Sequence, residues 1–86
     1  MTFLISYDHQ SEDFLKKSDS FIAKRILDKI RELLSTTPVP HQAVAIVGEH
    51  GVFRIRIGDY RALYRVNYAE SKIIVLKIDK RSKVYD

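Results

Sequence analysis

"VFRIRIGDYRALYRV" (residues 52–66) alternates apolar and polar side chains on both sides of Gly58 and Asp59. A two-residue loop with glycine first is typical of a type II′ turn between antiparallel strands. This turn pairs Ile57 with Tyr60 and Arg56 with Arg61, and the same register continues along both strands. The stretch therefore predicts a hairpin of strands 52–57 and 60–68.

The predicted hairpin has two different faces, because successive side chains of a strand point to opposite sides of the sheet. One face is an apolar surface suited to the core: Phe53, Ile55, Ile57, Tyr60, Ala62 and Tyr64. The other face is basic and should be exposed: Val52, Arg54, Arg56, Arg61, Leu63 and Arg65.

The arginines of the second face call for an explanation, because like charges opposite each other across a sheet cost roughly 0.2–1 kcal/mol. Arg54 and Arg56 lie about 6.5 Å apart along one strand, with Arg61 across from them. A guanidinium donates paired hydrogen bonds to phosphate oxygens and keeps its charge at physiological pH. We favour a phosphate-binding row over a solvated strand face, since this face has no acidic residue before Asp59.

The N-terminal half predicts a short strand followed by two helices. "TFLISY" (residues 2–7) is apolar and β-branched, as a strand would be. "SEDFLKK" (residues 11–17) fits a short helix with its N-cap among residues 8–11. From residue 19 to about 35, apolar side chains recur every three or four positions, as on a helix with one buried face. The two helices should form a hairpin.

The remaining segments complete an α+β fold. A strand is predicted at 72–79, apolar on both faces around "IIVL", whereas "AVAIV" (residues 43–47) is either a strand or irregular buried chain. We expect a single domain, residues 1–86. Its architecture is an antiparallel β-sheet of about four strands, with the N-terminal helical hairpin packed on one face.

Composition favours a soluble protein, and its uneven charge suggests a polyanionic partner, although a net charge of +4 alone fits an inert basic surface better. The net charge is +4, and residues 44–86 supply all of it, with nine basic and five acidic side chains. The N-terminus lacks a signal-peptide pattern and no apolar run is long enough to span a membrane, so we expect a cytoplasmic protein. There is no cysteine, no motif predicts a metal or cofactor, and the glycines are explained by turns.

The C-terminal tail and the histidines are weaker candidates for a site. Lys80, Arg81 and Lys83 precede Tyr85, and a tyrosine beside basic residues can stack on an unpaired base. Taken alone, Tyr85 is as readily a packing residue. The three histidines, His9, His41 and His50, are isolated and fit surface positions. His50 precedes Gly51 and lies nearest the basic strand.

"GVFRIRIGDYRALYRV" (residues 51–66) followed by "IIVLKIDKRSKVY" (residues 73–85) resembles the C-terminal half of the RelE/ParE toxin superfamily. These are the toxins of bacterial and archaeal toxin–antitoxin pairs. The order of elements also agrees with that fold. The basic residues at the active positions make the chain more similar to RelE than to ParE. The resemblance implies a ribosome-dependent endoribonuclease that cleaves messenger RNA in the A site, and a cognate RelB-type antitoxin as partner.

The resemblance also implies the residues of the site and the reaction. The 2′-hydroxyl beside the scissile phosphate attacks, while basic residues hold that phosphate and Tyr85 positions a base. The implied catalytic residues are Arg54, Arg56, Arg61, Arg81 and Tyr85, and the implied RNA-binding residues are Arg65, Lys80 and Lys83.

The chain departs from the superfamily pattern in two places. Some members have lysines where this chain has Arg54 and Arg56, and a guanidinium is a poor proton shuttle. Proton transfer is then left to solvent or to a group such as Tyr85 or Lys80. The interval from Arg81 to Tyr85 is also short. Two other functions stay open: a ParE-like toxin that inhibits a protein such as DNA gyrase, and a non-catalytic RNA- or ribosome-binding module.

Overall fold

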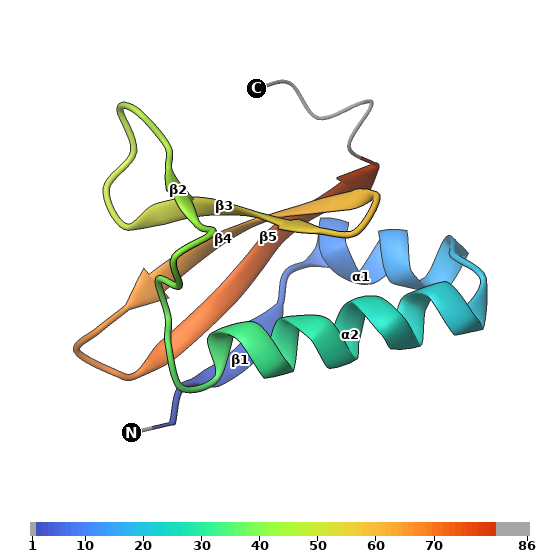
Figure 1. Cartoon of the computed structure of the whole chain (residues 1–86), viewed down its shortest axis with the longest axis horizontal. Coiled ribbons are helices and arrows are strands. Elements are labelled where there is room, and N and C mark those ends of the chain that lie inside the picture. The colour runs from blue at the N-terminus through green and yellow to red at the C-terminus, as the bar shows by residue number, and fades with distance from the viewer. Residues whose placement is uncertain (1, 81–86) are drawn as a thin grey trace.

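The computed structural model describes residues 2–80, which form a five-stranded sheet with two helices on one side (Figure 1). The strand order across the sheet is β1-β5-β4-β3-β2. The elements are β1 (Leu4–Tyr7), α1 (His9–Lys17), α2 (Ser20–Leu34), β2 (Val44–Ala45), β3 (Val52–Ile57), β4 (Tyr60–Asn67) and β5 (Lys72–Lys80).

The α+β class is confirmed, whereas the sheet differs in detail from the expected four antiparallel strands. A fifth strand is present because residues 44–45 pair with β3, which decides the question left open for this segment. The sheet is also mixed, since β1 runs parallel to β5 while the other neighbours are antiparallel. Two helices separate β1 from the other strands in the chain, so no tight turn forces β1 to be antiparallel to its neighbour.

The central hairpin has the predicted register, with Ile57 opposite Tyr60 and Arg56 opposite Arg61. Gly58 has a φ of 58°. Asp59 is not among the described residues with positive φ, which fits a type II′ turn. Local turn chemistry therefore sets the alignment of β3 with β4.

Each helix begins at an aspartate that accepts a hydrogen bond from a backbone N–H of its first turn. Asp8 accepts from the N–H of Gln10 at 2.9 Å, so α1 begins two residues before the expected position. Asp19 accepts from the N–H of Phe21 at 3.0 Å and starts α2. Of the α2 stripe, the side chains of Ile26, Ile30 and Leu34 are fully buried.

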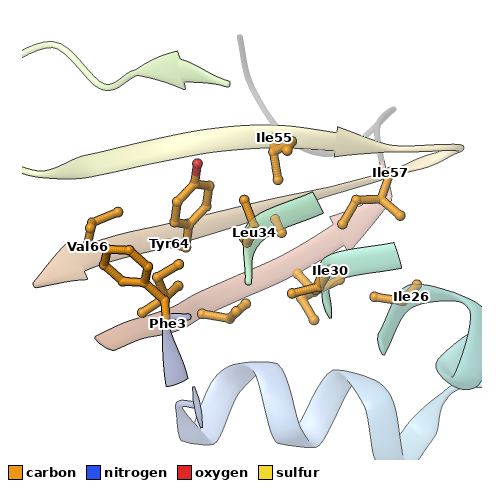
Figure 2. Close-up of a cluster of buried hydrophobic side chains, with 12 residues drawn as sticks. Phe3, Ile26, Ile30, Leu34, Ile55, Ile57, Tyr64 and Val66 are labelled. Atoms are coloured by element: carbon orange, nitrogen blue, oxygen red, sulfur yellow. The ribbon is translucent and has the colours of Figure 1, made fainter. Parts of the chain in front are cut away.

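The core lies between α2 and the helix-facing side of the sheet (Figure 2). Ile26, Ile30 and Leu34 of α2 meet sheet residues such as Ile55 and Tyr64 there. Where α1 covers β5, buried Ser11 donates to the Val75 carbonyl at 2.9 Å, so its hydroxyl is satisfied.

The strand β5 contains a β-bulge that reverses which side chains face the helices. Tyr64 pairs with Val75 but the preceding Leu63 pairs with Lys77, so Leu76 has no partner position on β4. Val75 and Ile78 both face the core, three positions apart instead of two or four. Lys77 and Asp79 consequently lie on the side of the sheet away from the helices.

One residue of the predicted exposed face is buried. Val52 is only 3% exposed, although it lies on the same side of β3 as Arg54. The segment before it runs back along β3, and the Ile46 N–H donates to the Val52 carbonyl at 3.0 Å. At the same end, Gly51 has a φ of 73°, and a Cβ there would lie 3.3 Å from the Val66 carbonyl oxygen. The chain before β3 therefore covers this face at Val52.

Tyr64 joins the sheet to the connection after α2. Its ring is fully buried, its hydroxyl donates to the Pro38 carbonyl at 2.8 Å, and burial raises its pKa above the ordinary value. We expect Tyr64→Phe to lower the free energy of unfolding by about 1–2 kcal/mol, because the Pro38 carbonyl loses its donor. Denaturant unfolding of both proteins measures this. No loss of stability would mean that water replaces the hydroxyl as donor.

Candidate functional site

The arginine face is the side of the sheet opposite the helices, where β3 and β4 carry Arg54, Arg56, Arg61 and Arg65. Arg54 and Arg56 are two residues apart on β3, which spaces them about 6.6 Å along the strand. Arg61 lies directly opposite Arg56. Arg56 is exposed, while Arg54 and Arg61 are half-buried. Three of the predicted site residues are thus brought together near the Gly58 turn.

An acidic residue stands in the same row, which the sequence did not lead us to expect. Asp79 of β5 pairs with Arg61 in the sheet register, on the side away from Arg56. The row therefore reads Arg56, Arg61, Asp79 across three strands. Arg61 has an opposite charge on one flank and a like charge on the other, so the repulsion inferred from the hairpin alone is not its whole environment.

Lys77 lies beside Asp79 on the arginine face. Its Nζ is 3.3 Å from Asp79 Oδ2, and the side chains are 55% and 27% exposed, respectively. The register places Lys77 next to Leu63, which in turn stands opposite Arg54. The described part of the site thus combines three guanidinium groups, one ammonium and one carboxylate. Such a set can hold a phosphate and can also accept a proton.

Arg65 belongs to the same face but lies away from this group. It is four positions after Arg61, a separation of about 13 Å along β4. Its Nη2 is 3.7 Å from Glu49 Oε1 in the β2–β3 connection, and both side chains are about half exposed. The face is therefore not free of acidic residues, because the fold brings Glu49 and Asp79 to it from other segments. A role of Arg65 in RNA binding stays a prediction.

Lys80 stands on the other side of the sheet. It pairs with Tyr60, whose ring packs edge-on against Phe14 of α1 at 5.9 Å. The register thus directs Lys80 toward the helix side, away from Arg61. Arg81, Lys83 and Tyr85 lie outside the described residues, so their proposed roles stay predictions.

A cleft of about 610 Å³ opens on the helix side, between α2 and the Gly58 turn. Its apolar walls include Ile22 and Tyr60, and Arg25, Glu32 and Asp59 line it with charges of both signs. None of the residues that line it belongs to the arginine face. The three histidines are exposed, and residues 2–80 hold no group of three His, Asp or Glu side chains placed to bind a metal.

Sequence reasoning missed Asp79 and Lys77 as members of the site. Strict alternation from Ile73 and Val75 puts both on the core side of β5. The bulge at Leu76 moves them to the arginine face. The available signal was chemical, since a lysine and an aspartate two residues apart are poor core residues.

Comparison with known families gives a match that covers nearly the whole chain. Residues 5–85 match the family described as the ParE toxin of the type II toxin–antitoxin system parDE. RelE1 of Methanocaldococcus jannaschii is 37% identical over 65 residues, which cover 69% of this chain and 72% of that protein. Neither described helix has the length and apolar character needed to cross a membrane.

Solved structures show the same fold. RelE in the archaeal RelE–RelB complex from Pyrococcus horikoshii superimposes with a TM-score of 0.79 at 28% identity, over 98% of this chain and 100% of that one. The isolated RelE toxin of Escherichia coli gives a TM-score of 0.77 at 18% identity, over 95% of this chain and 87% of that one. At 18% identity, the similarity to the Escherichia coli toxin shows a shared fold and nothing more.

Proposed function

The chain belongs to the ParE toxin family of type II toxin–antitoxin systems, within the RelE/ParE superfamily, and from that membership we propose that it is a ribosome-dependent endoribonuclease. Its substrate is messenger RNA in the ribosomal A site, and it acts in the cytoplasm, where translation occurs. The observation that carries the proposal is the convergence of Arg54, Arg56 and Arg61 on the side of the sheet opposite the helices.

The proposed reaction is transfer of a phosphate ester within the RNA. The 2′-hydroxyl attacks the adjacent phosphorus and the 5′ oxygen leaves, which produces a 2′,3′-cyclic phosphate and a 5′-hydroxyl end. Negative charge grows on the phosphate oxygens as the attack proceeds. Guanidinium groups already in place around them stabilise that charge more than they stabilise the substrate. Arg54, Arg56 and Arg61 have this role, joined by Arg81, while Tyr85 holds a base.

The proposed partner is a cognate antitoxin of the RelB type. The Pyrococcus horikoshii relative was solved as a complex of RelE with RelB. On this chain, an acidic segment laid over the arginine face would match its charge and block access to RNA. Toxin and antitoxin would then form a hetero-oligomer.

Cleavage on programmed ribosomes tests the proposal. Purified protein is added to ribosomes that carry a messenger with a defined codon in the A site, and primer extension maps the new 5′ ends. We expect cuts confined to the A-site codon, and the same RNA without ribosomes serves as control. Binding without cleavage would contradict the proposed endoribonuclease activity and favour an RNA-binding module.

A second candidate function has one observation in its favour, because the matching family is described by its ParE member. A ParE-like toxin would inhibit a protein target such as DNA gyrase and would cut no RNA. A supercoiling assay with purified gyrase, run beside the ribosome assay, separates the two. Inhibition of gyrase at equimolar protein, with intact messenger, would establish this alternative.

Salt dependence of ribosome binding measures the phosphate contacts. Each contact with single-stranded RNA releases counterions and contributes about −0.7 to the slope of log K against log salt concentration. Three or four contacts from the arginines therefore predict a slope of about −2 to −3. Titration by fluorescence anisotropy between low and physiological salt gives this value. An affinity independent of salt would contradict the proposed contacts between the arginines and the RNA phosphates.

A further inference from the structure

The proposed reaction needs a proton acceptor that the arginines do not provide. The attacking 2′-hydroxyl must lose its proton as the oxygen bonds to phosphorus. A guanidinium stays protonated at physiological pH and has no acceptor atom. Arg54, Arg56 and Arg61 can therefore hold the phosphate but cannot take this proton.

We propose that the Asp79 carboxylate is the general base of this site. The inference rests on the proposed function and adds a residue to it. Asp79 stands directly beside Arg61 in the sheet register. The Cβ atoms of such cross-strand pairs are about 4.5–5.5 Å apart. A ribose attached to a phosphate held by Arg61 thus lies within reach of this carboxylate.

The bulge in β5 is the feature that puts Asp79 there. If Leu76 were paired regularly and β5 had no bulge, alternation would direct Asp79 to the core side and Ile78 to the arginines. With the bulge, Ile78 is buried at 2% exposure and Asp79 faces the arginines. Bulges are over-represented beside active sites, where they redirect a side chain.

Lys77 contacts the Asp79 carboxylate but leaves some of its hydrogen-bond acceptor sites available. The 3.3 Å contact joins Lys77 Nζ to Oδ2 only. An ionised carboxylate has about four lone-pair sites on its two oxygens, so others remain for a substrate hydroxyl. At 27% exposure, the side chain of Asp79 is partly covered but reachable.

The other described carboxylates near the hairpin are placed less well. Glu49 pairs with Arg65, about 13 Å along β4 from Arg61. Asp59, in the turn, lines the cleft on the helix side. Among residues 2–80, Asp79 is thus the carboxylate in register with the arginine row.

The step balances without a further cofactor. The 2′ O–H bond breaks and its proton passes to an Asp79 oxygen, while the 2′ oxygen forms a bond to phosphorus. The bond from phosphorus to the 5′ oxygen breaks, and that oxygen keeps the electron pair and takes a proton from water. Asp79 then releases its proton to solvent. Nothing is oxidised or reduced.

Single-turnover cleavage by Asp79→Asn on programmed ribosomes tests the inference. The amide has the same shape but accepts a proton poorly, so the rate should fall about 10²–10⁴-fold. Ribosome affinity should stay the same or increase, since a negative charge is removed from a face that binds phosphate. The matched control is Asp59→Asn, which should keep the wild-type rate. Added imidazole, a base without negative charge, should restore part of the rate of Asp79→Ala and leave the wild type unaffected.

The outcomes separate this inference from the proposed function. A wild-type protein that leaves messenger intact on ribosomes overturns both. An active wild type together with an unimpaired Asp79→Asn variant overturns the inference alone. So does a variant that loses ribosome affinity or thermal stability along with its rate, because Asp79 would then be a structural residue. A slow Asp79→Asn variant with normal ribosome binding, together with rescue of Asp79→Ala by imidazole, supports the inference, and a failure of imidazole to rescue Asp79→Ala contradicts it.

Discussion

Replacing Arg61 by alanine should lower the rate of messenger cleavage by about a hundredfold or more, because one preorganised donor to the developing phosphate charge is lost. The same change should alter the free energy of unfolding by less than about 1 kcal/mol. Arg61 stands between Arg56 and Asp79, so a repulsion and an attraction are removed together. Primer extension on programmed ribosomes gives the rate, and thermal unfolding gives the stability.

Arg65→Ala is the matched control for this experiment. It removes the same side chain from the same strand and face, about 13 Å from Arg61. We expect weaker ribosome binding at most, with the rate of the bound complex unchanged. If Arg61→Ala unfolds the protein, Arg61 is structural. If the Arg61→Ala variant cleaves messenger as fast as the wild type, Arg61 does not stabilise the charge on the phosphate and the proposed role of the arginines is contradicted.

Replacing Ile30 by alanine should lower the free energy of unfolding by about 2–5 kcal/mol. Ile30 is fully buried on α2, between Ile26 and Leu34, so its loss leaves a cavity (Figure 2). A domain of this size has a total stability of about 5–10 kcal/mol. The variant should therefore be close to unfolding at growth temperature, and its toxicity on expression should become temperature-sensitive.

Denaturant unfolding of Ile30→Ala measures this loss, with Val47→Ala as control. Val47 is 98% exposed in the β2–β3 connection, so its truncation should change stability by less than about 0.5 kcal/mol. Equal effects of the two changes would contradict the assignment of the core to the interface of α2 with the sheet.

Much of the fold was predictable because the signals that specify it are local. Gly58 and Asp59 select a turn, and the turn sets the register of its two strands. Asp8 and Asp19 begin the helices, and the stripe on α2 selects its buried side. Each of these features depends on residues close together in the chain.

The arrangement of β1 and β2 was less accessible, since both strands join the sheet through contacts with distant residues. The first runs parallel to β5, nearly 70 residues later, and the second comprises only Val44 and Ala45. Neither has a turn that fixes its partner. Likewise, no local pattern indicated that Val52 would be buried at 3% exposure.

By itself, the sequence determined the hairpin and placed Arg54, Arg56 and Arg61 on one face, because turn geometry and two-residue alternation act within a few residues. Only the tertiary structure decided that Asp79 and Lys77 join them. The segment "IIVL" is apolar at four successive positions, so alternation cannot show where the phase of β5 changes. The phase of β5 changes at Leu76 because the side chains of Val75 and Ile78 both pack in the core. Packing against distant residues thus put a carboxylate beside the arginines.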